Sequence, residues 1–502
     1  MFVAPDPGRV RLRVSARAVL GTGLAVAAAE LAGLSLVAAV TGGLAALLAL
    51  FTVADATVRR QAVTTALLPA VGFPVLAVAT ALHAAPLLRA GTWLVVVFLG
   101  VYARRWGARG HALGIFAFMM FFATQFLRAV PRQLPELYAA IALALAACGT
   151  VRFGLWCMER RTPPPAVPAP LPGRGLDRLT TRQAFQTTLA CGVALAVGQV
   201  LSQERWYWAV GTAWWIFVNT ASRGETLVRG FRRVVGTVAG IAAGLLVALP
   251  LDGAPGPTAA LVAACVFGIF YTAPLSYSWM MFFVTVMAGL LYGLLGVLHP
   301  GLLLLRFQET AVGALGAALG VALVLPVTTH AATNAWIRRA VRSVHECTTV
   351  AMVRLSGDED ADPAPHAAEL EVLLARVRTS LAPLVHPLSP LRARKARARH
   401  VLALLDDCAR EVRGLAAVAA DPYASHDARL AAACWRVEAA VHALEDPAAG
   451  PVRSPDGAGA SVPAHHPGAE AALIHLHGLE KALADLAAPL STSPRAPLVA
   501  AA

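Results

Sequence analysis

The chain has 502 residues, of which 57% are hydrophobic and only 14% are charged. Soluble domains carry about 25% charged residues, so this composition excludes an ordinary soluble protein and indicates a membrane protein. The net charge of +13 comes from residues 1–330, where 24 arginines stand against 10 acidic residues, whereas residues 331–502 hold 18 basic and 19 acidic residues. Because this tail is nearly neutral, it offers no basic face to a nucleic acid, and we set that class of partner aside.

Residues 1–158 contain apolar stretches that predict a first set of six transmembrane helices. A bilayer core needs about 20 apolar residues per helix, and continuous runs rich in Ala and Leu indicate helices rather than barrel strands. The stretch 18–54 is too long for one span and predicts two. The remaining spans are predicted at 62–82, at 92–103 or from about Pro86, at 112–127 and at 134–157.

Two acidic residues accompany the first spans. Glu30 lies within the apolar stretch 18–54, and Asp55 borders its end. Ionisable groups inside a membrane are costly, and they are candidates for function by default. We therefore predict Glu30 and Asp55 as candidates for proton or ion coupling, with a hydrogen-bonded structural carboxyl as the alternative for Glu30.

A proline-rich segment divides the apolar region. Residues 159–181 contain six prolines between positions 163 and 172, a density that predicts an extended linker rather than a helix. Six further apolar stretches follow within residues 182–329, at 183–201, 206–221, 234–249, 258–273, 279–298 and 302–325. We therefore predict an all-α polytopic membrane protein with about twelve spans, arranged as two six-helix repeats that run parallel because each has an even number of spans.

Arginines lie mainly on one side of the predicted spans. The segments on the side of the amino terminus hold 21 arginines and the opposite segments hold five. Since cytoplasmic loops are enriched in Lys and Arg, we predict that both termini lie in the cytoplasm.

The tail, residues 330–502, contains helical stretches that are too short or too polar to span a bilayer. They lie at 331–355, 367–381, 391–418, 427–444 and 468–486. We predict a cytoplasmic helical domain with a disordered insertion at 446–467, which is rich in Pro, Gly and Ser.

Two similar motifs occur in the second set of spans. Their residues are Arg233, Gly236, Thr237 and Gly240 in one, with Gly244 following, and Arg306, Glu309, Thr310 and Gly313 in the other, with Gly316 and Gly320 following. Spacings of three, four and seven place each motif on one stripe of a helix. The six glycines predict close helix packing, because small residues let a neighbouring backbone approach.

The charged and aromatic residues of these spans are the candidate site. Arg306 and Glu309 are three residues apart, which predicts an intrahelical ion pair at the start of the last span. We predict that Arg233, Thr237, Arg306, Glu309 and Thr310 bind or gate the substrate. Trp206 and Trp208 are candidates for stacking on an aromatic substrate, and an interfacial tryptophan belt is the alternative.

Taken in order, these residues resemble a known family. The order Trp206-x-Trp208, Arg223-Gly224, the basic run ending at Arg233 and the two motifs resembles the fusaric acid resistance (FUSC-like) proteins, which include aromatic acid exporters. The resemblance covers residues 182–325, and residues 13–157 resemble the family in layout alone. It implies a two-repeat transporter of the bacterial inner membrane, with cytoplasmic helices, that exports aromatic or other small organic acids.

The sequence contains none of the common motifs of enzymes or metal sites. The sequence contains no G-x-x-x-x-G-K-[ST], G-x-S-x-G or H-E-x-x-H motif and no C-x-x-C pair, so we predict no enzymatic activity, no cofactor and no metal site. We predict a secondary transporter of organic anions. A passive organic-anion channel and a non-transporting scaffold of the cell envelope are the alternatives. The predicted partners are the lipid bilayer, a small organic anion, and either a second copy of the chain or an envelope protein.

Overall fold

The computed structural model describes residues 6, 9–159, 175–251, 253–355, 358, 360–385, 392–419, 428–445 and 467–491, and the regular elements among them are all helical. The chain divides into two compact units. The first, which we call the membrane unit, comprises Met1–Pro165 with Pro170–Pro326, and the second comprises Ala166–Ala169 with Val327–Ala502.

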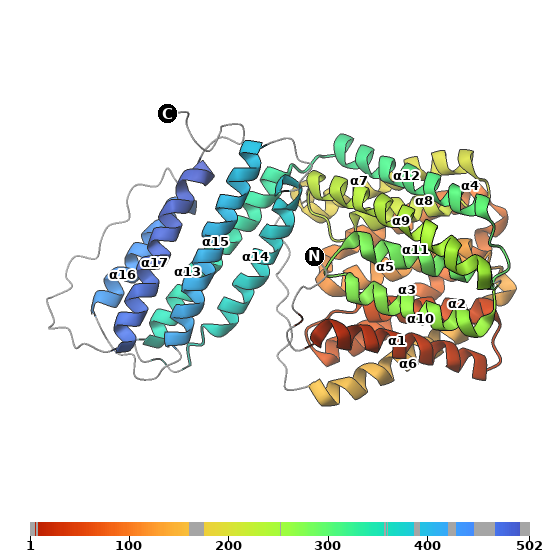
Figure 1. The fold of residues 1–502 in the computed structure, drawn as a ribbon, viewed down its shortest axis with the longest axis horizontal. Coiled ribbons are helices and arrows are strands. Elements are labelled where there is room, and N and C mark those ends of the chain that lie inside the picture. The colour runs from red at the N-terminus through yellow and green to blue at the C-terminus, as the bar shows by residue number, and fades with distance from the viewer. Residues whose placement is uncertain are drawn as a thin grey trace. The chain divides into compact units, whose positions relative to one another are not determined.

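The described part of the membrane unit contains twelve α-helices (Figure 1). They are α1 (Val10–Leu31), α2 (Leu36–Thr52), α3 (Val58–Ala81), α4 (Pro86–Tyr102), α5 (Gly107–Phe126), α6 (Leu134–Glu159), α7 (Leu179–Leu201), α8 (Tyr207–Phe217), α9 (Arg223–Leu251), α10 (Pro255–Thr272), α11 (Tyr277–Leu294) and α12 (Pro300–Leu323). The predicted division of residues 18–54 is confirmed. It falls at Gly33, whose φ of 68° ends α1, and Ser35 then accepts the Ala38 N–H at the start of α2.

Eight helical stretches of this unit are long and apolar enough to cross a bilayer, as expected of a multi-pass membrane protein. One of them, Pro86–Phe126, includes both α4 and α5, which a short 3₁₀ turn at Ala103–Trp106 separates. The prediction of a full span at 206–221 is wrong, because α8 has only 11 residues and is therefore about 16 Å long. The chain straightens at Val218, and Asn219 adopts a left-handed conformation with φ 61°.

Helix neighbours recur between the two halves of the membrane unit. In the first half α1 packs on α2 and α6, α2 packs on α6, α3 packs on α5 and α6, and α4 packs on α5. In the second half α7 packs on α8 and α12, α8 packs on α12, α9 packs on α11 and α12, and α10 packs on α11. Across the halves, α4 packs on α7 just as α10 packs on α1. Adding six to each helix number of the first half gives the corresponding pair of the second half in all these cases. The contacts of α2 with α5 and of α8 with α9 have no such counterpart.

The helices of the membrane unit also share two ends. The odd-numbered helices begin at one end, which we call the near end, and finish at the other, the far end, because short turns join most successive helices. At the near end Gln186, early in α7, donates to the backbone oxygen of Val324 after α12, at 2.8 Å. At the far end Arg128, in the turn before α6, pairs with Glu204, in the turn before α8.

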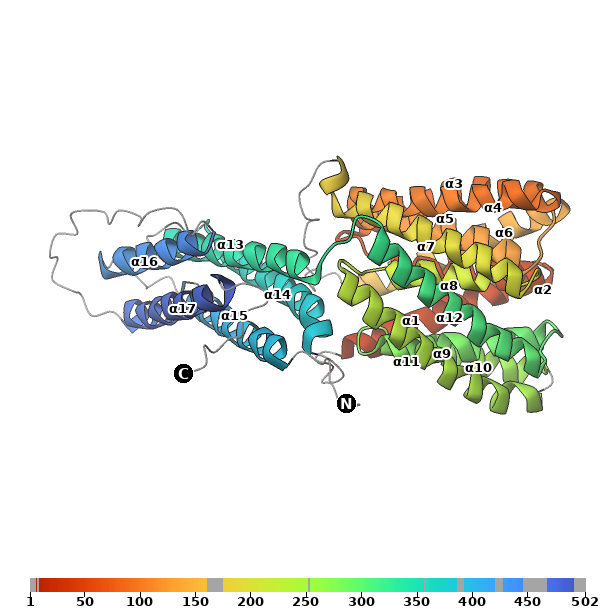
Figure 2. The same cartoon turned by 90° about the horizontal axis from the view of Figure 1, so that it is seen from above.

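The centre of the membrane unit is aromatic. Helix α8 lies between the side formed by α3, α4 and α5 and the side formed by α9, α10 and α11 (Figure 2). Nine of the 11 residues of α8 are buried, and so are 13 of the 20 residues of α5. The rings of Phe118 on α5 and Trp214 on α8 stack with centroids 4.3 Å apart. This arrangement holds α8 against rigid, close-packed neighbours.

Five of the six glycines of the two motifs lie where neighbouring helices approach closely. A Cβ atom at Gly236 would be 2.2 Å from the backbone oxygen of Ser278 on α11, and one at Gly313 would be 2.5 Å from that of Ala209 on α8. Gly240 also faces α11, and Gly316 and Gly320 face α7, with comparably short distances, whereas a Cβ at Gly244 would meet nothing nearer than 3.8 Å.

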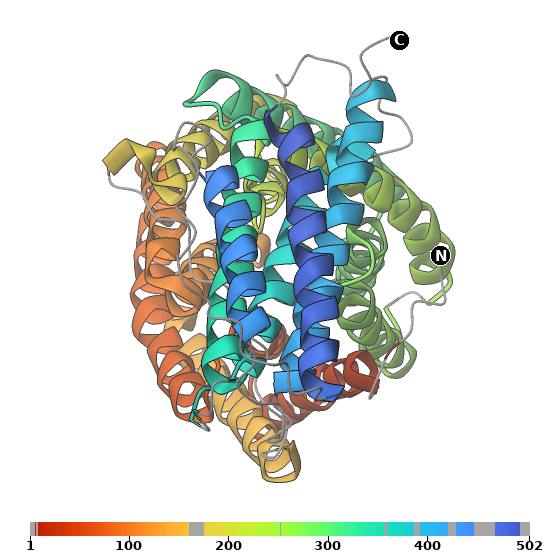
Figure 3. The same ribbon diagram turned by 90° about the vertical axis from the view of Figure 1, so that its left-hand side faces the viewer.

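The second unit is a bundle of helices that run alongside one another (Figure 3). They are α13 (Thr329–Leu355), α14 (Ala364–Val385), α15 (Arg392–Ala419), α16 (Ala428–Glu445) and α17 (Pro467–Ser491). Leu373, Val437 and Leu476 are among its buried apolar residues. Residues 160–174 of the predicted linker and 446–466 of the predicted insertion lie outside the described residues, and α7 begins at Leu179, before the predicted linker ends.

Candidate functional site

Two charged residues of α12 are buried within the membrane unit. The helix begins after His299, whose Nδ1 accepts the Leu302 N–H at 3.1 Å. Two turns later Arg306 is 4% exposed, and Glu309, one turn further, is 1% exposed. Thr310 is also buried, but its hydroxyl donates to the Arg306 backbone oxygen at 2.8 Å, so it is satisfied within the helix.

The Arg306 side chain rests on an aromatic residue. Its Cζ lies 3.2 Å from the ring centroid of Trp208 on α8, and the indole Nε1–H of Trp208 donates to the hydroxyl of Tyr292 on α11. On the other side, Arg205 places its Cζ 5.1 Å from the ring centroid of Tyr292. A cation over the face of an aromatic ring is stabilised by the ring quadrupole, and most strongly by that of Trp. Trp208 thus positions Arg306.

The predicted ion pair between Arg306 and Glu309 is wrong. No ion pair within 4.0 Å joins these side chains in the described structure, because the guanidinium turns toward Trp208 instead. The Nε of Arg306 and one carboxylate oxygen of Glu309 are buried, and the described residues offer neither of them a hydrogen-bond partner. A buried polar atom without a partner costs about 1–3 kcal/mol, and more when the group is charged. The site therefore holds an unused donor and an unused acceptor.

The first motif forms a second polar position, on α9. Arg233 is 4% exposed, and its Nη1 donates to the Tyr277 hydroxyl on α11 at 3.0 Å and lies 3.3 Å from the Met281 sulfur. Its Nε is buried without a partner in the described structure. Thr237, one turn further, is buried. Each of the two motifs thus buries an arginine whose Nε has no partner in the described structure.

The other predicted residues lie in different places. Trp206 is 3% exposed and packs edge-on against Trp93 with centroids 5.4 Å apart, so it belongs to the aromatic centre. Asp55 is half-buried in the turn between α2 and α3, near Arg152. Glu30 is exposed next to the last residue of α1, so it is not buried within the membrane unit. Its helix ends because Gly33 breaks it, which leaves the last turn at the surface.

Comparison with known proteins finds a similarity in the second half of the membrane unit and the start of the second unit. Residues 190–333 match the family model described as fusaric acid resistance protein-like. The match confirms the resemblance seen in the sequence and contains both motifs. No curated protein and no solved structure matches the chain. Together with the apolar helices, the match supports a multi-pass membrane protein of transporter type.

Sequence reasoning missed two residues of the fusaric acid resistance protein-like region. Tyr277 and Tyr292 are buried on α11, where they hydrogen-bond with Arg233 and Trp208 respectively. Both are hydroxyl-bearing residues in an otherwise apolar stretch. Because a buried tyrosine hydroxyl usually has a partner, that signal was available in the sequence.

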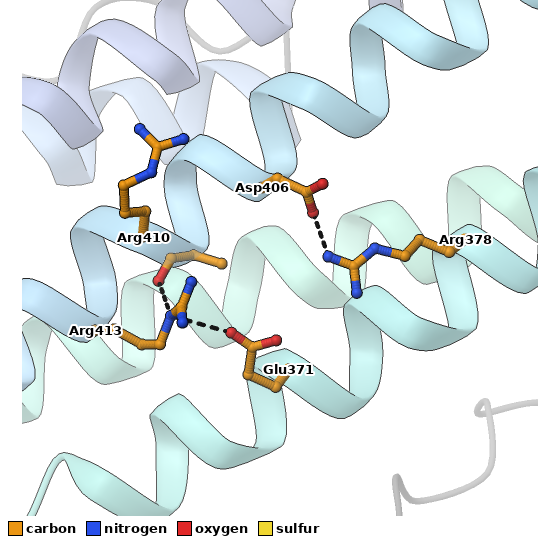
Figure 4. A pocket seen from close by; sticks show the side chains of 6 residues that line it. Glu371, Arg378, Asp406, Arg410 and Arg413 are labelled. Carbon is orange, nitrogen blue, oxygen red and sulfur yellow. Dashed lines mark hydrogen bonds and ion pairs between the residues drawn. The ribbon is translucent and has the colours of Figure 1, made fainter. Parts of the chain in front are cut away.

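The second unit has an open pocket of about 410 Å³ between α14 and α15 (Figure 4). Arg378 pairs with Asp406 there, and Arg413 lies 3.2 Å from a carboxylate oxygen of Glu371. These side chains are between 41% and 60% exposed. Exposed pairs of this kind satisfy one another and are worth about 0–1 kcal/mol. The pocket therefore has none of the unused polar atoms that distinguish the site on α12.

Proposed function

We propose that the protein is a secondary transporter that exports small organic anions, including aromatic carboxylates, along the buried arginine and aromatic residues of its second half. The observation that carries the proposal is the position of Arg306, buried against Trp208 with its Nε–H unused. An anionic carboxylate can take two parallel hydrogen bonds from a guanidinium, which suits Arg306 to such a ligand.

Binding can be coupled to a local rearrangement. Arg306 covers one face of Trp208, so an aromatic acid that draws the guanidinium toward its carboxylate uncovers a ring on which it can stack. Glu309 lies one turn away, and one of its carboxylate oxygens has no hydrogen-bond partner in the described structure. When the substrate brings a second carboxylate into the site, Glu309 can take up a proton, which reduces the repulsion between the two negative charges. In this proposal Glu309 is the coupling acid of the site, while Glu30 and Asp55 stay predictions. No enzymatic activity and no cofactor belong to the proposal.

The proposal includes two parallel six-helix repeats in a bacterial inner membrane. The shared pattern of helix neighbours supports equivalent halves, and the excess of arginines in near-end segments supports a cytoplasmic near end and cytoplasmic termini. Helices α2 and α8, with 17 and 11 residues, would then be short members at the centre, where protein rather than lipid surrounds them. A second copy or an envelope protein as partner stays a prediction.

Flux measurements distinguish this function from its alternatives. The purified full-length protein is reconstituted in vesicles, and the movement of radiolabelled benzoate is followed with and without a pH gradient. Accumulation against the benzoate gradient is expected of the transporter. Movement only down the gradient would favour a passive channel, and no movement of benzoate or of other organic acids would favour the scaffold.

Cysteine labelling tests the topology without added reporters. Cys157, near the near-end terminus of α6, is exposed, whereas burial raises the pKa of the Cys347 thiol to about 11 and that of Cys408 to about 12. Because the thiolate is the reactive form, these buried thiols react slowly at pH 7.5. We expect a membrane-impermeant maleimide to label Cys157 in inside-out vesicles and not in intact cells.

The control for this labelling is the Cys157→Ser variant. It removes the reactive thiol and should lose most of the signal. What remains measures the contribution of other thiols such as half-buried Cys434, whose thiol pKa burial raises to about 11. Labelling of Cys157 from outside intact cells would show that the topology is the reverse of the one proposed.

A further inference from the structure

Three arginines lie around the near-end terminus of α8. Arg104, which follows α4, donates from Nη1 to the backbone oxygen of Phe217 at 3.0 Å, and its Cζ lies 5.7 Å from the ring centroid of Trp214. On α9, Arg229 places its Cζ 3.9 Å from the ring centroid of Tyr277, whose hydroxyl accepts a hydrogen bond from Arg233. The Tyr277 hydroxyl in turn lies 3.4 Å from the backbone oxygen of Trp215, next to Trp214, so the three guanidinium groups lie around the same end of α8, and we call them the inner cluster.

Each arginine of the inner cluster has at least one buried nitrogen without a hydrogen-bond partner among the described residues. In the part of the chain that the structure describes, none of its arginines forms an ion pair, and four of its nitrogens are buried without a hydrogen-bond partner: Nε and Nη2 of Arg104, Nε of Arg229 and Nε of Arg233. The carboxylate of Glu225, the acid nearest to Arg229 along α9, accepts from the Ala221 N–H at 3.0 Å and from the Ser222 hydroxyl at 3.3 Å. Clustered like charges repel and buried unpaired donors are costly, so the cluster is incomplete as it stands.

An arginine of the first half shows what a purely structural role requires. Arg152 on α6 caps the near-end terminus of α2, the helix that corresponds to α8. Its Nη1 donates to the Val53 oxygen at 2.8 Å and lies 3.4 Å from the Gln61 side-chain oxygen, and its Nη2 donates to the Ala49 oxygen at 2.8 Å. No buried nitrogen of Arg152 lacks a partner, unlike those of Arg104. Capping α8 therefore explains the hydrogen bond from Nη1 of Arg104. It does not explain why Nε and Nη2 of the same side chain are buried without partners.

We infer that Arg104, Arg229 and Arg233 form a second anion-binding site for a small carboxylate, in series with the site at Arg306. The inference rests on the proposed function and deepens it. The site takes Arg104 from the first half and Arg229 and Arg233 from the second, so a bound carboxylate bridges the two halves. Trp214 and Tyr277 border it with aromatic surface, which suits the same substrates that Trp208 suits. An anion occupies this site between the near end and Arg306.

Binding stoichiometry tests the inference. Equilibrium dialysis of the full-length protein in detergent with radiolabelled benzoate is expected to give two bound molecules per chain. Arg229→Gln, which removes a charge that makes no backbone hydrogen bond, is expected to weaken one of the two sites by about tenfold and leave the other unchanged. Arg104→Gln is expected to have the same effect. Arg152→Gln is the matched control, and the folded fraction of this variant is expected to bind benzoate at both sites.

The outcomes separate this site from the transport function. Benzoate flux by the wild-type protein with only one bound benzoate, or with two that are unaffected in Arg229→Gln, overturns the inner site and leaves the function intact. Absence of both flux and binding overturns the two together. If Arg104→Gln does not fold, Arg229→Gln still tests the inference. The guanidinium of Arg229 contacts an aromatic ring and does not cap a helix, so its loss is not expected to prevent folding.

Discussion

Replacing Arg306 by Lys is expected to lower benzoate flux about 10- to 100-fold, the range that follows from losing a charge-assisted hydrogen bond worth about 1.5–3 kcal/mol. Lysine keeps the positive charge beside Glu309 and Trp208 but presents a point charge in place of the planar fork. The loss should therefore be larger for carboxylates than for small inorganic anions. The measurement is flux into vesicles at matched protein content for benzoate and for chloride.

The matched control is Arg128→Lys. Arg128 is 63% exposed at the far end and pairs with Glu204 outside the buried site, so this variant is expected to transport like the wild type. Arg306→Ala should lose flux more completely, since it removes both the charge and the guanidinium fork that the proposal assigns to carboxylate binding. Wild-type rates in Arg306→Lys would show that Arg306 acts only as an interfacial anchor, a role that Lys serves equally well.

Gly236→Ala is expected to destabilise the membrane unit by about 1–3 kcal/mol, the usual cost of overpacking. The new Cβ would lie 2.2 Å from the Ser278 backbone oxygen and 2.9 Å from the Met281 Cβ, and backbone atoms cannot rotate away as side chains can. Helix α9 would have to move off α11, and with it Arg233 off Tyr277. The measurement is thermal unfolding in detergent, in which we expect a midpoint lower by several degrees.

Gly244→Ala provides the control on the same helix. Its Cβ would meet the nearest atom at 3.8 Å, an ordinary contact, and alanine is favoured over glycine in a helix by about 0.5–1 kcal/mol. This variant should unfold at the wild-type temperature or slightly above it. Equal midpoints for the two variants would mean that α9 and α11 do not pack as closely as described.

Helical architecture could be predicted from the sequence because it depends on local patterns. Long apolar runs without alternation predict helices, and a glycine such as Gly33 within a run too long for one span predicts a break. The length of α8 could not be predicted in this way. Its apolar run continues to Ala221, and the helix ends earlier at Phe217, where Arg104 from the first half holds the last carbonyl.

Part of the candidate site could also be predicted from the sequence, because spacing along one helix is a local pattern. Spacing along one helix places Arg306 and Glu309 on one face and identifies them as costly to bury, and the structure finds both buried. Spacing also favoured their pairing, because a sequence pattern contains only neighbours along the chain. Trp208 and Tyr292, which position Arg306, come from two other helices at large sequence separation.

The sequence by itself therefore determined the class of the protein, its helical composition and the two motifs that carry its charged residues, because composition and periodicity are local properties. Only the tertiary structure decided which partner each charge has. It turned Arg306 toward Trp208, placed Glu30 at an exposed helix end, and gathered Arg104, Arg229 and Arg233 around the end of α8. A buried charge takes the neighbours that packing brings to it, and packing depends on contacts between helices far apart in the chain.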